Sequence, residues 1–381
     1  MAGVYGSYWV SGNPPNSLSG QWIGTSNGDP QALMIIDLDR VRGRLSGHAY
    51  LFPDDENIPS TYARIDTEDT VAPFVIEANT IHFLSDRGYQ PTINELRDFY
   101  PDVTFPKLVT AEFLPKSAEK IELSWKTDAE TYGQATLHRT VSGEISKVLS
   151  NPDVTSWDDF QKYVTDKPNL GLIFRGQSAP WPLRTSFHRT NRRDLIRYLQ
   201  DDIPRLHHAL SPRTKHFFNL SNPIENGAFL NLAQHHGFPT PLLDWSRSPF
   251  VAAYFAYSEA KDHEFVRIYA FDQQMYEKHE VKKSHLNLLA PHFSILEAIS
   301  IENDRATPQQ GLLSLTNLED IEGFVLIREN CANQKYLHAF DLPRHEASKA
   351  LSDLRLMGIT RATMFPSIES TCLELRRLHF D

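Results

Sequence analysis

The stretch that decides how the second half of the chain folds is LIFRGQSAPW, residues 172–181. A short apolar run of the kind that forms a buried strand meets Arg175 and then a glycine. An unpaired guanidinium costs several kcal/mol to bury. Arg175 therefore either points into solvent or meets an anionic partner, and other motifs of the chain bear on that choice.

The bulk composition predicts an ordinary globular protein. With 381 residues, of which 40% are hydrophobic and 23% charged, the chain is long enough for roughly two domains. It has no apolar run near the ~20 residues that span a bilayer, and Pro and Gly interrupt residues 1–17 too early for a signal peptide. Cys331 and Cys372 form neither a disulfide framework nor a zinc set. We expect a soluble cytoplasmic protein that does not bind membranes.

The net charge of −10 is unevenly distributed. Residues 1–150 hold 20 acidic and 12 basic side chains, a net of −8, and residues 151–381 hold 28 and 26, a net of −2. An acidic N-terminal part is poorly suited to the phosphate backbone of a nucleic acid. The arginine cluster HRTNRRDLIR, at His188–Arg197, suits either a phosphate contact or a solvated helix face, and charge runs more often form the latter.

Residues 1–149 predict a β domain. The alternation in KIELSWK places Ile121, Leu123 and Trp125 on one face of a strand. QALMIIDLD, GRLSGHAYLF, FVIEANTIHFL and YGQATLHRT are further strand candidates, separated by turn-forming residues. Such spacing is typical of a small all-β barrel or sandwich. We expect this domain to serve either recognition or a purely structural accessory role.

A domain boundary is predicted near Ser150–Asp153. The segment VTSWDDFQKYV that follows has the pattern of a capped helix, with Thr155 or Ser156 as the N-cap and two aspartates in the first turn. Helix and strand patterns mix from there onward, and Gly237 is the expected stop of one helix. The fold class is therefore α+β, with an N-terminal β domain over 1–149 and an α+β domain over 150–381.

Four stretches of the second half resemble one known family. They are FRGQ with WPLRTSFHR (Phe174–Arg189), LAQHHGFPTPLLDWSRSPFVAAYFA (Leu232–Ala256), RATPQQGLLSL (Arg305–Leu315) and MFPSIESTCLEL (Met364–Leu375). In this order they resemble the FRG domain family, and the resemblance extends from about Thr155 to Leu375. The residues before ~150 lie outside it.

The layout also resembles the ADP-ribosyltransferase fold, in which an arginine on a first strand, a Ser/Thr-rich strand leading into a helix, and a late glutamate form the site. The resemblance implies that Arg175 binds the diphosphate of NAD⁺, Ser246 orients the ribose or the acid, Tyr254 stacks on nicotinamide, and Glu369, after a β-like stretch, is the catalytic acid. It implies further NAD⁺ contacts from Gly176, Gln177, His236, Asp244, Trp245, Arg305 and Gln310.

The chemistry of these residue types fits that reading. An arginine fork binds a diphosphate through parallel charge-assisted hydrogen bonds. Cleavage of the nicotinamide–ribose bond passes through an oxocarbenium-like state, as in glycoside hydrolysis, which a carboxylate stabilises. We expect an NAD-dependent ADP-ribosyltransferase or NAD glycohydrolase, with NAD as substrate and a protein or nucleic acid as acceptor. Fold-level association suggests a bacterial toxin or an anti-phage defence effector.

Several alternatives stay open. Arg175 could instead form a buried ion pair with Asp244, and Trp245 could be a packing aromatic. A metal site is not expected, because the adjacent His235 and His236 would point about 100° apart on a helix and the chain has few cysteines. The rival functions are a non-enzymatic nucleotide-sensing module and a metal-independent nuclease that uses histidine and arginine.

Overall fold

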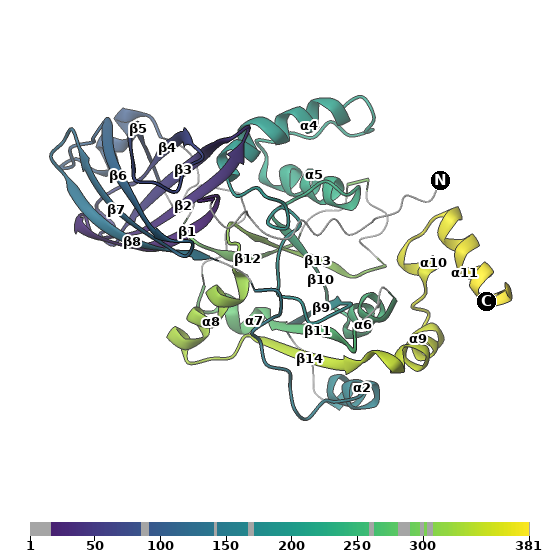
Figure 1. Cartoon of the computed structure of the whole chain (residues 1–381). Coiled ribbons are helices and arrows are strands. Elements are labelled where there is room, and N and C mark those ends of the chain that lie inside the picture. The colour runs from purple at the N-terminus through teal and green to yellow at the C-terminus, as the bar shows by residue number, and fades with distance from the viewer. Residues whose placement is uncertain are drawn as a thin grey trace. The chain divides into compact units, whose positions relative to one another are not determined.

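The computed structural model describes residues 17–84, 91–140, 143–166, 171–258, 263–280, 290–297, 301–302 and 308–380 (Figure 1). The chain divides into two compact units. The first comprises Met1–Val141, Phe187–Leu206 and Asn287–Ala290, and the second comprises Ser142–Ser186, His207–Leu286 and Pro291–Asp381. The boundary expected between residues 149 and 150 stays a prediction, and the first unit also takes in a segment from much later in the chain.

A closed eight-stranded antiparallel β-barrel forms the centre of the first unit. Its strands are β1 (Gly20–Asp29), β2 (Ala32–Val41), β3 (Arg44–Pro53), β4 (Ser60–Glu68), β5 (Phe74–Phe83), β6 (Leu108–Ser117), β7 (Lys120–Thr127) and β8 (Tyr132–Thr140), with helix α1 (Ile93–Phe99) between β5 and β6. Each strand pairs with the next, and β8 pairs with β1. The sequence was compatible with either a barrel or a sandwich. The pairing of β8 with β1 closes the sheet, so the domain is a barrel.

Large apolar side chains fill one end of the barrel interior. Alternate residues of each strand point inward. At this end the inward side chains are fully buried: Trp22, Leu38, Leu45, Ile65, Ile121 and Leu137. The guanidinium of Arg139 lies 4.4 Å from the centroid of the Trp22 ring and donates hydrogen bonds to the carbonyl oxygens of Ser17, Ser19 and Ala118. A cation over an aromatic face is attracted to it, so Arg139 stabilises this end of the core.

The outer face of the barrel carries a second apolar cluster, which includes one residue, Ile196, of the late segment Phe187–Leu206. That segment contains α3 (Leu195–Arg197), the π-helical turn η1 (Tyr198–Asp202) and the start of α4 (Ile203–Leu210). Ile196 of α3 packs with Tyr50 and Tyr62 of the barrel in this cluster. Two pieces of chain about 150 residues apart thus share one core.

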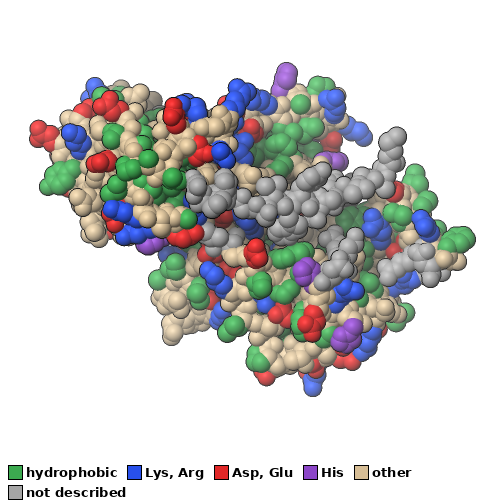
Figure 2. All heavy atoms as spheres, in the orientation of Figure 1, with side chains coloured by type: hydrophobic (Ala, Val, Ile, Leu, Met, Phe, Trp, Pro, Cys, Tyr) green, Lys and Arg blue, Asp and Glu red, His purple; other side chains and the backbone are tan. Residues whose placement is uncertain are grey.

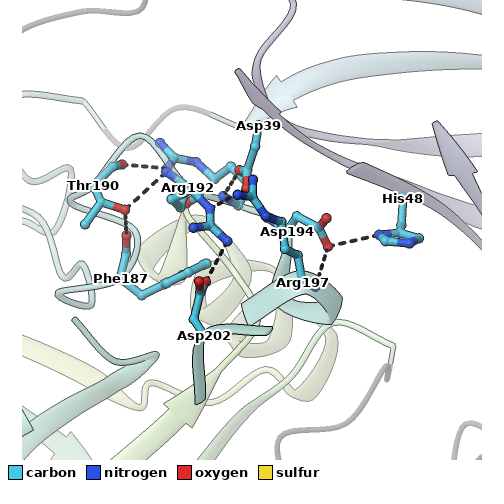
Figure 3. A network of polar contacts seen from close by, with 9 residues as sticks. Asp39, His48, Phe187, Thr190, Arg192, Asp194, Arg197 and Asp202 are labelled. Carbon is cyan, nitrogen blue, oxygen red and sulfur yellow. Dashed lines mark hydrogen bonds and ion pairs between the residues drawn. The ribbon is translucent and has the colours of Figure 1, made fainter. Parts of the chain in front are cut away.

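Asp39 on β2 anchors this segment to the barrel (Figure 3). Its buried carboxylate accepts hydrogen bonds from Arg192 Nε and from the backbone N–H of Arg193, each at 2.5 Å. Arg192 also donates through Nη2 to Asp202, at 2.8 Å. Burial raises the pKa of Asp39, while the charge of Arg192 and the hydrogen bond from Arg193 act in the opposite direction. Asp39 therefore combines a buried ion pair with a backbone anchor.

Asp194 adds a second connection next to the first (Figure 3). Its Oδ1 lies 2.9 Å from Nδ1 of His48 on β3 and accepts the backbone N–H of Arg197 at 3.2 Å, which caps α3. The cluster His188–Arg197 was expected to form a solvated helix face or a phosphate contact. In the structure Arg193 and Asp194 are buried instead, because their backbone N–H groups bind the carboxylate of Asp39 in the same unit.

Asp37 occupies the same outward face of β2, two residues before Asp39. Its carboxyl is buried and accepts a hydrogen bond from Gln21 Nε2 at 2.9 Å. Burial raises the pKa of Asp37 well above its usual value, and the hydrogen bond from Gln21 acts against that rise. Two carboxyl groups on one strand thus meet different environments, with a guanidinium at Asp39 and a neutral amide at Asp37.

The second unit contains a six-stranded antiparallel sheet in the order β12-β13-β10-β9-β11-β14. The strands are β9 (Leu172–Gln177), β10 (Leu242–Ser246), β11 (Phe265–Asp272), β12 (Phe293–Leu296), β13 (Gly311–Thr316) and β14 (Leu337–Pro343). The helices are α2 (Trp157–Asp166), α5 (Pro223–His235), α6 (Pro249–Ser258), α7 (Gln273–Glu277), α8 (Ile321–Ala332), α9 (Ala347–Leu356), α10 (Arg361–Met364) and α11 (Ile368–Phe380). The predicted α+β class is confirmed, and Ser156 caps α2 by accepting the N–H of Asp159.

Both faces of this sheet are covered by helices. One core cluster joins the sheet to α2, α6 and α9, and contains Phe174. The other joins the sheet to α7 and α8, and contains Trp245 and Tyr269. A strand that is buried on both faces has a continuous apolar run rather than an alternation, which explains the run Ile268–Phe271 within β11.

The described surface carries mixed charge. On the face that Figure 2 shows, acidic and basic side chains are interspersed over both units. This pattern differs from the continuous basic surface that binds nucleic-acid phosphates. Within the described residues, no helix is both long and apolar enough to cross a membrane.

We predict that Asp39→Ala lowers the free energy of unfolding of the first unit by about 3–5 kcal/mol, because it leaves the guanidinium of Arg192 without its buried partner. The matched control is Asp66→Ala. Asp66 pairs with Arg44 at 2.7 Å, but both side chains are about half exposed, so its loss should cost less than about 1 kcal/mol. Urea unfolding at pH 7 measures both values. Equal losses would show that burial of the Asp39 pair is unimportant.

Candidate functional site

The three residues of the FRG motif divide between the two faces of strand β9. Phe174 is fully buried in the cluster beneath α6. Gly176 faces the same helix, and a Cβ at this position would collide with the carbonyl oxygen of Ala252. Arg175 points to the opposite side, because successive side chains of a strand alternate. Phe174 and Gly176 are therefore packing residues, which leaves Arg175 as the motif's charged group.

Arg175 lies where two neighbouring strands diverge. β9 and β10 are joined through one residue pair, Phe174 with Ser246, whereas β9 pairs with β11 along its whole length. The side chain of Arg175, 15% exposed, reaches towards β10 and donates from Nη1 to the backbone carbonyl of Asp244 at 2.7 Å. The guanidinium thus connects the two strands beyond their single pair.

The expected ion pair between Arg175 and Asp244 is long. Nη1 of Arg175 lies 3.9 Å from Oδ2 of Asp244, whose side chain is 67% exposed. A pair with one solvated partner contributes little to stability. The contact of Arg175 Nη1 with the backbone carbonyl of Asp244, at 2.7 Å, is the shorter of the two.

A chain of polar side chains continues from Asp244. Its Oδ1 accepts a hydrogen bond from Gln234 Nε2 at 2.6 Å, and Gln234 Oε1 accepts one from the hydroxyl of Thr240. Thr240 in turn accepts at its carbonyl oxygen from Ser186 Oγ at 3.1 Å. Gln234 was not predicted as a site residue, although it stands in the quoted LAQHHG motif.

Ser246 fixes a turn rather than presenting a free hydroxyl. Its buried Oγ donates to the carbonyl of Gln309 at 2.7 Å and accepts the N–H of Ser248 at 3.1 Å. Gln309 Nε2 donates to the carbonyl of Met364 at 3.0 Å, which ties α10 to the same turn. Gln310 follows with a left-handed φ of 48° and an exposed side chain. Gln309 was also missed from the sequence.

Three other predicted contact residues lie in the packed interior of the unit. Trp245 is 3% exposed and donates from Nε1 to Ser314 Oγ at 2.9 Å. Tyr254 of α6 is 6% exposed and belongs to the core cluster beneath that helix. Gln177 is buried and donates to the carbonyl of Trp181 at 2.8 Å. The structure thus brings Arg175, Asp244 and Ser246 together at one strand junction and places these three side chains in the interior.

The stretch expected to be β-like before Glu369 contains no strand: it consists of the short helix α10, the irregular residues 365–367 and the start of α11. The chain passes from α10 into α11, and Glu369 stands exposed in the first turn of α11. Within the described part of the chain, Glu369 forms no hydrogen bond or ion pair. The side chain of Glu374, five residues further along α11, is 12% exposed and pairs with Arg355 at 3.0 Å. Residues of α9 and α11 contact each other there, which the sequence did not indicate.

The remaining predicted residues are separate from this junction or not described. His236 is exposed at the C-terminal end of α5, and its ring centroid lies 5.4 Å from that of His235. Arg305 lies outside the described residues. Among the described side chains, no group of three His, Cys, Asp or Glu is placed to hold a metal ion.

Comparison with known proteins identifies the domain. Residues 171–264 match the family model of the FRG domain, so the C-terminal α+β region contains an FRG domain, as the motifs Phe174–Arg189 and Leu232–Ala256 predicted. The stretches Arg305–Leu315 and Met364–Leu375 lie outside this match, and the longer extent to Leu375 stays a prediction. The match includes β9, β10 and the residues at their junction. No curated protein sequence matches the chain.

Two solved structures, both redesigned β-barrels, are similar to about a third of the chain. One is mFAP1 bound to DFHBI, which is 14% identical, with 32% of this chain and 94% of that chain covered and a TM-score of 0.22. The other is b11L5F_LGL, which is 12% identical, with coverages of 32% and 92% and a TM-score of 0.23.

We predict that Gly176→Ala destabilises the second unit by about 1–3 kcal/mol or more, because the added methyl group forces α6 away from β9. Gly227→Ala is the control. Gly227 lies within α5, where a Cβ meets open space, so this change should stabilise the helix by up to about 1 kcal/mol. Thermal and urea unfolding measure both. A neutral Gly176→Ala would mean that close packing of α6 does not require the motif's glycine.

Proposed function

We propose that the FRG domain binds NAD⁺ with its diphosphate at Arg175 and catalyses transfer of ADP-ribose from it. The observation that carries the proposal is the position of Arg175, at the divergence of β9 and β10, with its Nη1 on a backbone carbonyl. A planar guanidinium suits the two-point binding of phosphate oxygens.

The position of Asp244 supports the proposal that a nucleotide binds at this junction. Its exposed carboxylate lies beside Arg175 and is oriented by Gln234. A carboxylate next to a phosphate-binding group is a common partner for ribose hydroxyls in dinucleotide sites. In this proposal Asp244 accepts a hydrogen bond from a ribose hydroxyl while Arg175 binds the diphosphate.

Glu369 is the proposed acid for the chemical step. Its charge would stabilise the oxocarbenium-like cation that forms as nicotinamide leaves. Hydrogen bonds run from Ser246 through Gln309 to Met364, so α10, which ends five residues before Glu369, lies next to the Ser246 turn. The side chain of Glu369 is exposed and therefore accessible to a bound ligand.

A second candidate function is nucleotide sensing without turnover. It is favoured by the position of Glu369 on α11, which is not part of the sheet that carries Arg175, and by the engagement of the Ser246 hydroxyl in the turn. A domain with the binding groups assembled and the acid on a separate helix would bind NAD⁺ and release no nicotinamide.

The binding step is tested with Arg175→Lys in the full chain. Lysine keeps the charge but loses the planar fork, so the dissociation constant for NAD⁺ should rise about tenfold or more, equivalent to about 1.4 kcal/mol, with little change in melting temperature. Arg213→Lys is the control, because Arg213 also donates from Nη1 to a backbone carbonyl, that of Ala209, at 2.7 Å, and is exposed. Calorimetric titration measures both. Failure of the wild-type chain to bind NAD⁺ would overturn the proposal.

The chemical step is tested with Glu369→Gln. NAD⁺ should still bind, while nicotinamide release falls by about 10²–10³-fold, since the lost interaction acts mainly in the transition state. Glu264→Gln is the control, because Glu264 is another exposed glutamate of this unit, whereas the ion pair of Glu374 makes that residue unsuitable. Unchanged release would exclude Glu369 as the acid and leave Asp244 to be tested as Asp244→Asn. Saturable binding without release in the wild type would support sensing instead.

A further inference from the structure

The two ends of the β-barrel interior differ in how completely side chains fill them. Opposite the end that is filled by Trp22 and its neighbours, several of the inward positions are taken by small residues. Ala49 pairs with Ala63 across β3 and β4, and Ala63 pairs with Thr80 across β4 and β5. A cavity of about 440 Å³ remains there, also lined by Ala111 of β6. An eight-stranded barrel has room for either a side-chain core or one small ligand, and this barrel contains both, one at each end.

One end of the cavity is formed by the connections between strands. Its lining includes Asp29–Pro30 between β1 and β2, Ile58–Pro59 between β3 and β4, Asp102–Pro106 between β5 and β6, and Ala129 between β7 and β8. In an up-and-down barrel every second connection lies at the same end. The cavity therefore extends from the middle of the barrel to one rim, which gives a ligand a route of entry.

The walls of the cavity are mainly apolar. Met34, Leu51, Ile76, Phe113, Leu123 and Trp125 all contribute. Protein interiors are close-packed, with few voids larger than a water molecule. A void of this size, which lies within the range of about 300–1,000 Å³ typical of small-molecule sites, is a candidate binding site rather than a packing irregularity.

The polar groups of the wall already bind one another. Trp125 Nε1 donates to Ser26 Oγ at 3.2 Å, and the hydroxyls of Thr127 and Thr131 lie 2.7 Å apart. Nε2 of His82 lies 2.8 Å from the carbonyl oxygen of Pro106, which requires a proton on that nitrogen. A ligand in this cavity therefore has little need to supply hydrogen bonds.

The cavity carries no positive charge. Its lining, all within the described residues, includes Asp29 and Asp102 at the rim but neither lysine nor arginine. Nδ1 of His82 lies 2.9 Å from the hydroxyl of Thr61 and can accept its proton, and burial lowers the pKa of His82, so the ring is neutral near pH 7. An anion would meet two carboxylates at the rim and no cation inside, at a large desolvation cost.

We propose that the barrel binds one uncharged, predominantly apolar small molecule in this cavity. The ligand enters past the connections at residues 29–30, 58–59 and 102–106 and lies against Ala111, Leu123 and Trp125. This site is built entirely by the barrel unit and does not depend on the function proposed for the FRG domain.

The first experiment compares two fluorescent probes on the full chain. N-phenyl-1-naphthylamine is neutral, and 8-anilinonaphthalene-1-sulfonate has the same ring system with an added sulfonate. The neutral probe should bind saturably with one site per chain, and the sulfonate should bind at least about tenfold more weakly, because the cavity offers no cation. Absence of saturable binding of the neutral probe, or tighter binding of the sulfonate, would overturn the proposal.

The second experiment fills the cavity. Ala111→Phe places a ring in the lumen and should weaken binding of N-phenyl-1-naphthylamine at least about tenfold, as expected when ligand and side chain compete for one apolar volume. Glu112→Phe is the matched control, one residue along β6 on its outward, exposed face, and should leave the affinity unchanged.

Folding of each variant is followed by its melting temperature. If Ala111→Phe does not fold, Ala49→Leu on β3 tests the same prediction with a smaller added volume. Wild-type affinity for the probe in a folded lumen variant, or equal losses in Ala111→Phe and Glu112→Phe, would place the probe outside the cavity and overturn the proposal. NAD⁺ binding, measured on the same samples, should not change, which separates this site from the one at Arg175.

Discussion

The buried carboxylate of Asp39 is the constraint on which the first unit depends. A barrel closes its own backbone hydrogen bonds, but the outer face of β2 and β3 still presents Asp37, Asp39 and His48, which an isolated barrel would expose to water. The segment Phe187–Leu206 covers this face because Asp39 binds both the side chain of Arg192 and the backbone of Arg193. A buried carboxylate is tolerated only when charge and hydrogen bonds compensate its lost hydration, so the late segment and the barrel require each other.

In the second unit, two residues of the FRG motif pack against a helix and the third, Arg175, carries the charge. The alternation of strand side chains sends Phe174 and Gly176 towards α6 and Arg175 to the other face. Gly176 allows the helix to approach closely, and the position of the helix in turn fixes the strand that carries Arg175. The arginine can then reach Asp244 across strands that are joined at a single pair. Precise placement of one charged side chain thus depends on close packing behind it.

The barrel interior also divides its residues between packing and another role, here the lining of a cavity. Large inward residues at one end supply the apolar burial that stabilises a small domain, and small residues at the other end leave space. Because the two sets lie at different heights along the same strands, the stable core and the cavity do not compete for the same positions. This arrangement lets a barrel keep an open volume without giving up the core that holds it together.

The sequence by itself determined the elements whose signals are local. Alternation over KIELSWK and its neighbours indicated β strands. Thr155 or Ser156 with two aspartates indicated the start of α2, and the motifs between Phe174 and Ala256 indicated the FRG domain. Periodicity and capping depend on residues a few positions apart, so they can be read without knowledge of the fold.

Only the tertiary structure decided how distant residues meet. Pairing of β8 with β1 made the barrel, and the distance in sequence between Asp39 and Arg192 hid their ion pair, so His188–Arg197 resembled a solvated face. Gln234 and Gln309 form hydrogen bonds with residues at or beside the Arg175 junction that are not their neighbours in sequence, so no local pattern predicted them. Glu369 was expected after a strand, but helical packing placed it on α11. The cavity had no sequence signal at all, because an inward alanine becomes a void only when its neighbours across the barrel are also small.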